Sequence, residues 1–358
     1  MLVECNLRGD IPEGIAKLRR LTVLDFSVTK LSAKIPSGLY NISTLNILSL
    51  DMNQLDGSIA PDICSKLPNL AFFNVFGNQF TGMIPNSLSN ASGLGLINFG
   101  NNNFIGPMPE DLGELSDLQR MNFQHNQLED DTFFYLISYK LHWITISSCS
   151  RESSQSIPSG IGNLLNLTVL RMTSNYFSGP IPDTIGRLRK LQYLELAMNK
   201  FTELPSSIFG NITALNRLLL GKNNIHGSIP LSPGNCQRLS GLDLSHNNLY
   251  GSIPHEILNL SSISIFFNLG YNYLTGSIPS EVGSLKNLVE FDASNNRLSG
   301  FIPDSFSGCS SLEVLHLEGN SFQGEIPQGL REVRGLRELD LSHNNLTGLI
   351  PVISVSLH

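Results

Sequence analysis

The sequence SHNNLYGSIP occupies residues 245–254, and a near copy, SHNNLTGLIP, occupies residues 342–351. A duplicated site and a regular repeat both explain this, and the repeat is tested first because it decides the fold. Aligning every N-x-L-x-G-x-I-P gives a step of 24 residues between most copies, with a few steps of 23, 25 or 26. The two stretches are therefore copies of one repeat. Its asparagines are Asn53, Asn78, Asn102, Asn126, Asn175, Asn199, Asn223, Asn247, Asn272, Asn296, Asn320 and Asn344.

Each copy reads L-x-x-L-x-L-x-x-N-x-L-x-G-x-I-P, as in LEVLHLEGNSFQGEIP at residues 312–327. The L-x-L alternation predicts a short strand with its leucines turned inward. One coil of 24 residues cannot bury its own apolar face, whereas stacked coils share a continuous core. The repeat therefore predicts an α/β repeat solenoid: a right-handed superhelix of about fifteen coils, with a parallel β-sheet on its concave face and a single domain over residues 1–358.

The fixed polar and special residues of the repeat have predictable roles. The asparagine carries both a donor and an acceptor, so we expect it to bond its own turn and that of the next coil. Cys5, Thr29 and Cys149 occupy this position in weaker copies, with weaker bonding expected. The glycine suits a close backbone approach, and the I-P pair supplies an apolar plug and a fixed φ.

One segment, residues 127–158, breaks the pattern. Asp130 replaces the glycine and no I-P pair follows. Asp131 is a candidate N-cap for a short helix over residues 132–140, after which the strand LHWITI resumes at residues 141–146. A functional insertion and tolerated drift on the convex side both explain this segment.

The pattern resembles the plant-type leucine-rich repeat, whose signature adds L-x-G-x-I-P to the general L-x-x-L-x-L-x-x-N-x-L. Residues 259–303, NLSSISIFFNLGYNYLTGSIPSEVGSLKNLVEFDASNNRLSGFIP, are similar to the late repeats of plant receptor-like kinases that perceive microbial patterns or pathogen factors. In that family the repeats form a superhelix outside the cell, followed by a membrane helix and a cytoplasmic kinase. The resemblance implies recognition of an extracellular peptide or protein ligand, in defence or developmental signalling, with a co-receptor kinase as a second partner.

The chain departs from that family at both ends. It begins inside a repeat, at CNLRGDIP, and ends at PVISVSLH, without the cysteine caps of family ectodomains or any kinase signature. We expect a fragment or a truncated gene product that is not an enzyme, any kinase lying in a missing C-terminal domain. The resemblance implies the extracellular side of the plasma membrane, provided that the full-length parent has a signal peptide and a membrane helix; this chain encodes neither.

Two alternative functions stay open. A soluble extracellular inhibitor of cell-wall-degrading glycosidases uses the same repeat, in a shorter and capped solenoid. The other alternative is a truncated receptor-like serine/threonine kinase. The gene sequence that follows His358 would distinguish these functions from the receptor segment.

Composition excludes several partners. The net charge of −7 and the lack of a lysine or arginine cluster disfavour nucleic acid and an anionic membrane surface. His255-Glu256 begins like the zinc motif H-E-x-x-H, but Asn259 stands where the second histidine is required. We expect no catalytic, metal-binding or cofactor-binding residues.

The histidines and cysteines have structural explanations. Three histidines precede a repeat asparagine and are expected to be exposed at the sheet margin, too far apart to share a metal: His125, His246 and His343. Coils stack about 4.8 Å apart, so cysteines in different coils exceed the roughly 7 Å Cα separation of a disulfide. The cysteines, expected to be free thiols, are Cys5, Cys64, Cys149, Cys236 and Cys309.

Six N-x-S/T sequons predict glycans on the outer wall of a secreted solenoid. Four of them recur at one place in the repeat, just before a strand. The sequon asparagines are Asn41, Asn90, Asn166, Asn211, Asn259 and Asn345.

The outward strand positions form the candidate ligand-binding surface, because all coils share the concave sheet. An apolar stripe beside a polar stripe is typical of a docking surface, although packing along any strand would also explain it. No strand carries the Arg-x-Arg pair that some peptide-hormone receptors use to hold a free carboxylate, which disfavours such a ligand. The candidate residues are Ile47, Phe72, Asn74, Phe76, Leu96, Asn98, Arg120, Asn122, Trp143, Arg171, Tyr193 and Glu195.

Overall fold

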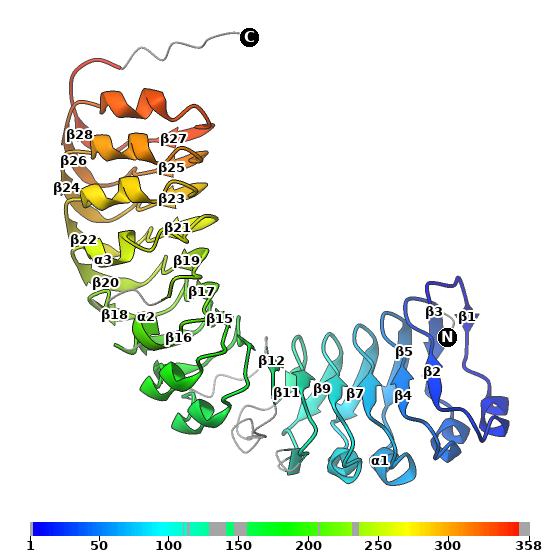
Figure 1. Cartoon of the computed structure of the whole chain (residues 1–358). Coiled ribbons are helices and arrows are strands. Elements are labelled where there is room, and N and C mark those ends of the chain that lie inside the picture. The colour runs from blue at the N-terminus through cyan, green and yellow to red at the C-terminus, as the bar shows by residue number, and fades with distance from the viewer. Residues whose placement is uncertain are drawn as a thin grey trace. The chain divides into compact units, whose positions relative to one another are not determined.

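The computed structural model describes residues 3–109, 111–112, 115–128, 141–146, 156–206, 208–230 and 236–350. The chain divides into two compact units, Met1–Phe177 and Ser178–His358, each a stack of coils in chain order (Figure 1). The predicted single domain over residues 1–358 stays a prediction. The predicted helix over residues 132–140, the Asp131 cap and the Cys149 copy lie outside the described residues.

The L-x-L core of each repeat forms a short strand, as predicted, and these strands make the main sheet. The main sheet pairs neighbouring coils in parallel, in one register, so that Ile47 pairs with Phe72 and Phe72 pairs with Leu96. In the first unit its strands are β2 (Val23–Asp25), β4 (Ile47–Ser49), β6 (Phe72–Asn74), β8 (Leu96–Asn98), β10 (Arg120–Asn122), β12 (Trp143–Thr145) and β13 (Val169–Arg171). In the second unit they are β15 (Tyr193–Glu195), β17 (Arg217–Leu219), β19 (Gly241–Asp243), β21 (Phe266–Asn268), β23 (Glu290–Asp292), β25 (Val314–His316) and β27 (Glu338–Asp340).

The sequence did not predict the further parallel pairing formed by the N-x-L-x-G part of the repeat, which makes one separate sheet in each unit; the two are together called the second sheet. Its strands in the first unit are β1 (Arg8–Gly9), β3 (Lys30–Ala33), β5 (Gln54–Ser58), β7 (Gln79–Met83), β9 (Asn103–Gly106) and β11 (Gln127–Leu128). In the second unit they are β14 (Ser178–Pro180), β16 (Lys200–Glu203), β18 (His226–Gly227), β20 (Asn248–Gly251), β22 (Tyr273–Gly276), β24 (Arg297–Gly300), β26 (Ser321–Gly324) and β28 (Asn345–Leu346).

The repeat glycine lies in the second sheet, and the predicted close approach is present at some copies, such as Gly57 and Gly324, where a Cβ atom would meet a side chain of the preceding coil at 2.9 and 2.6 Å. Gly251 and Gly276 have φ of +81° and +78°, yet a Cβ atom there would meet only ordinary contacts at 3.7 Å. At Gly251 and Gly276 positive φ is therefore the reason for glycine.

The I-P pair closes most of the described coils as predicted, with Ile59-Ala60-Pro61 before α1 and Leu204-Pro205 before α2 as variants. The isoleucine is buried, as at Ile84 and Ile253, and the proline leads in extended backbone into a single helical turn. These turns are η1 (Glu13–Lys17), η2 (Ser37–Asn41), α1 (Ile63–Lys66), η3 (Asn86–Asn90) and η6 (Ser159–Asn163) in the first unit. In the second unit they are η7 (Asp183–Arg187), α2 (Ile208–Asn211), α3 (His255–Leu258), η8 (Ser280–Ser284), η9 (Asp304–Gly308) and η10 (Gln328–Glu332).

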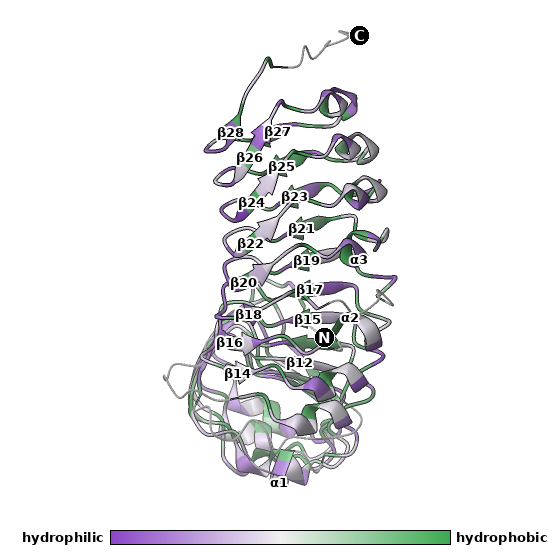
Figure 2. Cartoon of the chain, turned by 90° about the vertical axis from the view of Figure 1, so that its left-hand side faces the viewer, coloured by the Kyte–Doolittle hydropathy of each residue, from purple (hydrophilic) through white to green (hydrophobic). Residues whose placement is uncertain are grey.

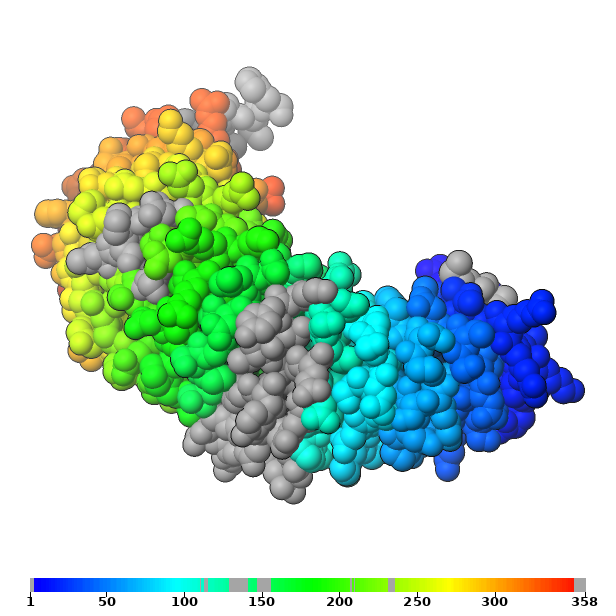
Figure 3. Space-filling view, turned by 60° about the horizontal axis from the view of Figure 1, so that its bottom comes forward, coloured from blue at the N-terminus to red at the C-terminus, as the bar shows by residue number. Residues whose placement is uncertain are grey.

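The core of each unit lies between these elements. The central residue of most main-sheet strands is fully buried, and hydrophobic segments return in successive coils (Figure 2). In space-filling view the coils follow one another as consecutive bands of colour (Figure 3). Phenylalanine takes the place of leucine at several inward positions of the repeat, and these rings contact one another in the core. The centroid of the Phe99 ring lies 4.9 Å from that of Phe73 and 5.3 Å from that of Phe104.

The repeat asparagine links coils, but to the preceding coil and not to the next one. Asn102 Oδ1 accepts the backbone N–H of Phe80 at 3.1 Å, and its Nδ2 donates to the carbonyl of Val75 at 2.9 Å, both one coil back. Nδ2 also donates to Phe99 and Gly100 carbonyls in its own turn. The same pattern recurs from Asn53 to Asn344, because the side chain points against the chain direction of stacking.

The described cysteines are free thiols, as predicted. Cys64, Cys236 and Cys309 are buried, and the thiols of Cys236 and Cys309 donate to carbonyl oxygens of the preceding coil. Burial raises the pKa of Cys64 to about 12 and those of Cys236 and Cys309 to about 11. Since the thiolate is the reactive form, these three thiols are chemically silent in the folded chain.

The rate of alkylation should distinguish the partly exposed cysteine from the buried ones. We expect iodoacetamide at pH 8 to modify the partly exposed Cys5 in the native chain, while Cys64, Cys236 and Cys309 react only after addition of denaturant. Peptide mass spectrometry of native and denatured samples measures this. Modification of Cys64 in the native chain as fast as Cys5, or a disulfide between any two of these residues, would contradict the burial.

Candidate ligand-binding surface

The outward face of the main sheet consists of the first and third residues of each strand. The central residues, such as Phe73, Ile97 and Met121, are buried, which turns the flanking residues of the same strands to the other side. Phe72, Leu96 and Trp143, predicted as outward residues, are partly exposed, and Arg120 is exposed. The predicted stripe of first positions is thus present in the first unit.

Not all outward residues are accessible. Ser49 and Thr145 are buried in third positions, and Val169 is buried in a first position. Ile47 is partly exposed beside Phe72, with which it pairs across the sheet. Phe76 follows β6 and is partly exposed, as expected for a residue that extends the same line.

The asparagines of this face, predicted as ligand contacts, make hydrogen bonds within the chain. Asn74 Oδ1 accepts the N–H of Phe76 at 3.2 Å, and its Nδ2 donates to Asp51 at 2.9 Å, so both ends of the amide are engaged. Asn122 Oδ1 accepts the N–H of Gln124 at 3.1 Å. Asn98 differs: within the described part of the chain, its buried Oδ1 has no hydrogen-bond partner.

A hollow of about 220 Å³ opens on the outward face of the first unit. Strands β8, β10 and β12 line it, together with Arg171 of β13. The guanidinium carbon of Arg120 lies 5.7 Å from the centroid of the Trp143 ring, and that of Arg171 lies 5.5 Å from it. Trp143 Nε1 donates to Thr145 Oγ1 at 2.7 Å, which fixes the indole.

The hollow gathers more than the sequence indicated. Asn98, Arg120, Asn122, Trp143 and Arg171 were predicted from their outward positions, and the structure brings them together. Gln124 and Thr145 also line the hollow and were not among the predicted residues. An Arg-x-Arg pair would place two arginines on one strand, whereas Arg120 and Arg171 come from different coils and both lie over the Trp143 ring.

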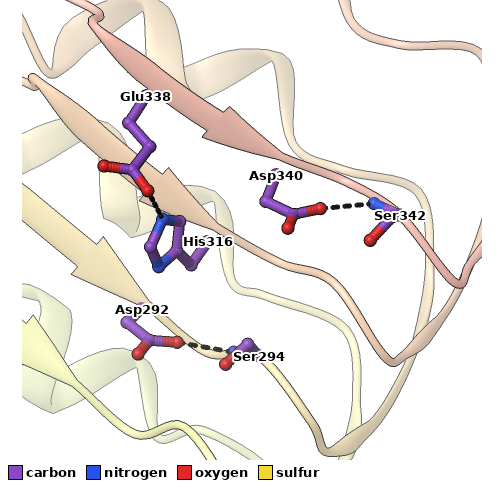
Figure 4. Close-up of polar contacts among 6 residues, drawn as sticks. All are labelled: Asp292, Ser294, His316, Glu338, Asp340 and Ser342. Carbon is purple, nitrogen blue, oxygen red and sulfur yellow. Dashed lines mark hydrogen bonds and ion pairs between the residues drawn. The ribbon is translucent and has the colours of Figure 1, made fainter.

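The outward face of the second unit begins with the predicted residues Tyr193 and Glu195, the first and third residues of β15, both partly exposed. Further along the unit the face becomes acidic. His316 Nε2 lies 3.0 Å from Glu338 Oε1 in the next coil (Figure 4). Burial, reinforced by the charge of Asp292, raises the pKa of Glu290.

Two aspartates of this acidic face have a local structural role. Asp292 accepts the N–H of Ser294, and Asp340 accepts the N–H of Ser342, each at 2.9 Å (Figure 4). The hydrogen bonds from Ser342 lower the pKa of Asp340. These carboxylates therefore close the turn after the strand, like the asparagines at the same position in the first unit.

The recurring sequons lie at the end of the helical turns, away from the main sheet. Asn41 and Asn90 end η2 and η3, Asn211 ends α2, and Asn259 follows α3; all four are exposed. Asn345 is also exposed, and Asn166 is partly exposed. Every predicted glycan position is thus open to solvent.

Within the residues that the structure describes, no group of three or more histidine, cysteine or acidic residues is arranged to hold a metal ion. His125, His246 and His343 are exposed, each with φ near +50°. Among the same described residues, no helix has the length and apolar character needed to cross a bilayer.

Family models for the leucine-rich repeat match residues 266–322 and, separately, residues 166–188, 190–212, 238–260 and 335–357. Receptor-like protein 31 of Arabidopsis thaliana is 35% identical over 81 residues, which cover 23% of this chain and 9% of that protein.

Solved structures resemble the chain over nearly its whole length. The leucine-rich repeat ectodomain of the Arabidopsis thaliana membrane receptor kinase GASSHO1/SCHENGEN3, in complex with CASPARIAN STRIP INTEGRITY FACTOR 2, is 30% identical with a TM-score of 0.89, over 97% of this chain and 41% of that one. The Arabidopsis receptor kinase HAESA, in complex with the peptide hormone IDA and the co-receptor SERK1, is 29% identical with a TM-score of 0.73, over 95% of this chain and 61% of that one.

The chain thus spans less than two thirds of each of these relatives. The repeat pattern, the stacked parallel sheets and the comparisons of sequence and structure all indicate leucine-rich repeats. The chain carries leucine-rich repeats in stacked parallel coils, and it is similar to plant receptor-like proteins and to the ectodomains of plant receptor kinases.

Proposed function

We propose that this chain is the extracellular ligand-recognition segment of a plant cell-surface leucine-rich repeat receptor, acting in defence or developmental signalling. Its ligand is a peptide or protein, and the segment binds without catalysing a reaction. Structural neighbours in complex with CASPARIAN STRIP INTEGRITY FACTOR 2 and with the peptide hormone IDA support this proposal.

The observation that carries the proposal is the outward face of the first unit. Ile47, Phe72, Leu96, Arg120 and Trp143 follow one another in register, one per coil, and none of them is fully buried. An extended ligand can therefore meet an aliphatic or aromatic side chain at nearly every coil. Partly exposed aromatic residues beside polar groups are typical of interface hot spots.

The surroundings of this face agree with an extracellular receptor. The exposed sequons lie on the helical turns, so glycans there would leave the main sheet open. A co-receptor kinase is the second proposed partner, since HAESA binds SERK1 in a complex of the same fold. The acidic outward face of the second unit is the surface we assign to it. Tyr193 and Glu195 remain predicted ligand contacts on β15.

Alanine substitution tests the ligand face. After a binding screen identifies a ligand, we expect Phe72→Ala and Trp143→Ala each to cost about 2 kcal/mol, which is roughly a 30-fold increase in Kd. Leu165→Ala is the matched control, because Leu165 is an exposed apolar residue outside the main sheet (58% exposed). Surface plasmon resonance measures Kd, and circular dichroism verifies folding. Unchanged affinity in both variants would show that the outward residues of these strands pack along the sheet and do not bind the ligand.

A further inference from the structure

We propose that the second sheet of the unit Ser178–His358 binds a linear acidic oligosaccharide of the uronic acid type. The binding surface, called here the tyrosine face, is formed by four segments of successive coils, residues 222–228, 246–252, 271–277 and 295–301. This binding goes beyond the proposed recognition of a peptide or protein ligand by the main sheet and does not depend on it.

The four segments lie next to one another because their coils stack in one register. The backbone N–H of Lys222 donates to the carbonyl of Ser245, and that of His246 donates to the carbonyl of Gly270. Lys222, His246 and Tyr271 therefore occupy the same point of three successive coils. The strands that follow this point, β18, β20, β22 and β24, are consecutive strands of the second sheet (Figure 2).

Three tyrosines expose their rings on this face. Tyr250 is 57% exposed, Tyr271 51% and Tyr273 45%. Tyr250 pairs with Tyr273 between β20 and β22, and the Tyr271 ring stacks on the His246 imidazole with the ring centroids 4.2 Å apart. Exposed apolar surface gathered in one place is typical of a binding site. The C–H groups on the faces of a sugar ring pack on such aromatic rings through dispersion and through the negative charge of the ring face.

Basic groups surround the rings, and the four segments contain no aspartate or glutamate. Lys222 and Arg297 are exposed, and neither forms an ion pair within the described part of the chain. Carboxylates of the same region lie instead on the main sheet, at Asp243, Glu290 and Asp292. The charges of this unit are thus separated between its two sheets, so an anion is attracted to the second sheet and repelled by the main sheet.

The polar groups between the rings favour a sugar over a peptide. Asn224, Asn248, Thr275 and Ser299 are exposed in the four segments, and each offers a donor and an acceptor to a sugar hydroxyl. The backbones of β20 and β22 pair with a neighbouring strand on both sides, so an extended peptide finds no free strand edge there. A uronic acid chain supplies ring faces, hydroxyls and carboxylates, all of which side chains alone can bind.

The tyrosine face is open and in part preorganised. None of the six sequons lies in its four segments, so the predicted glycans are attached elsewhere. The guanidinium carbon of Arg297 lies 4.8 Å from the centroid of the Tyr273 ring. This contact restricts the long arginine side chain before a ligand arrives, which lowers the entropy cost of binding. Glu203 of β16 pairs with His226 and bounds the face on one side.

Isothermal titration calorimetry of the full chain tests the proposal with three probes. They are hexagalacturonate, its fully methyl-esterified form and a hexaglutamate peptide, titrated at constant pH and ionic strength with EDTA present. The ester keeps the sugar rings without the charge, and the peptide keeps the charge without the rings. We expect saturable binding of hexagalacturonate and a Kd about tenfold or more higher for each of the other two probes.

Variants of the exposed side chains locate the binding. Tyr271→Ala and Tyr273→Ala should each raise the Kd for hexagalacturonate about tenfold, whereas Tyr271→Phe keeps the ring and should stay within about twofold. Lys222→Gln should raise the Kd about threefold or more. The matched charge change Arg187→Gln, at an exposed arginine of η7 outside the face, should leave it unchanged. Circular dichroism verifies the folding of each variant.

Equal affinities for hexagalacturonate and hexaglutamate would show that the chain recognises charge alone, which would overturn the proposal. The same holds for equal affinities for the acid and its ester, for no binding of hexagalacturonate, or for a Tyr271→Ala variant that binds like the unmodified chain. None of these results bears on the main sheet, because Phe72→Ala and Trp143→Ala test its ligand recognition separately.

Discussion

Replacing Phe99 with alanine is expected to lower the free energy of unfolding of the unit Met1–Phe177 by about 3–5 kcal/mol. Phe99 is fully buried, and its ring meets those of Phe73, Phe104 and Phe123 at centroid distances of 4.9, 5.3 and 5.7 Å. These rings come from three successive coils. Truncation therefore opens a cavity at the junction of neighbouring coils, and the backbone of stacked coils, tied by ladder hydrogen bonds, can close it only in part.

Urea denaturation followed by Trp143 emission measures this effect, because Trp143 lies in the same unit. Met83→Ala is the matched control: Met83 is 54% exposed on β7, and its removal should change the unfolding free energy by about 0.5 kcal/mol or less. A Phe99→Ala midpoint that coincides with that of Met83→Ala would show that the rings do not hold these coils together.

The sequence predicted the fold class because one physical requirement repeats in every coil. Leucines at alternate positions must be inward, so the main-sheet strands and their parallel stacking follow from the pattern alone. The second sheet could not be predicted in this way. Its N-x-L-x-G segment contains a single inward leucine, and its strands depend on ladder bonds between neighbouring coils, as where Tyr250 pairs with Tyr273.

The backbone conformation of the residue before the repeat asparagine could not be predicted from the pattern of residue types. It varies freely, from Met52 to His246 and Tyr271, yet its backbone has φ between 50° and 55° in all three. Since these side chains share no chemistry, no sequence signal marks the left-handed conformation. The asparagine that follows donates from Nδ2 to the backbone carbonyl three residues before it, as at Asn53, Asn247 and Asn272, which closes the turn.

The sequence predicted which residues of the candidate site lie on the outward face, but it did not predict which of them contact one another. Outward residues follow from strand alternation, and Arg120 and Trp143 are register partners in neighbouring strands. Arg171, by contrast, is the third residue of β13 and reaches the Trp143 ring diagonally. Such diagonal pairs depend on side-chain conformation as well as on register. That Asn98 Oδ1 lacks a hydrogen-bond donor among the described residues likewise follows only from the positions of all neighbouring donors, which the sequence does not give.

The second large effect is expected at the repeat asparagine. Asn247→Ala should destabilise the unit Ser178–His358 by about 2–4 kcal/mol, because it strands buried backbone groups. Asn247 Oδ1 accepts the N–H of Ile225 at 2.9 Å, and its Nδ2 donates to the carbonyl of Leu220 at 3.1 Å. Both residues are fully buried, so water cannot replace these bonds. Nδ2 also donates to Leu244 and Ser245 within its own turn.

The neighbouring asparagine provides the control for this prediction. Asn248 is exposed on β20 and its side chain makes no recorded bond within the described chain, so Asn248→Ala should cost about 0.5 kcal/mol or less. Hydrogen exchange adds the spatial signature: the amide of Ile225, one coil before the substitution, should lose protection in Asn247→Ala and keep it in Asn248→Ala. Loss of protection in the coil after Asn247 alone would contradict the direction of the ladder, since its bonds run to the preceding coil.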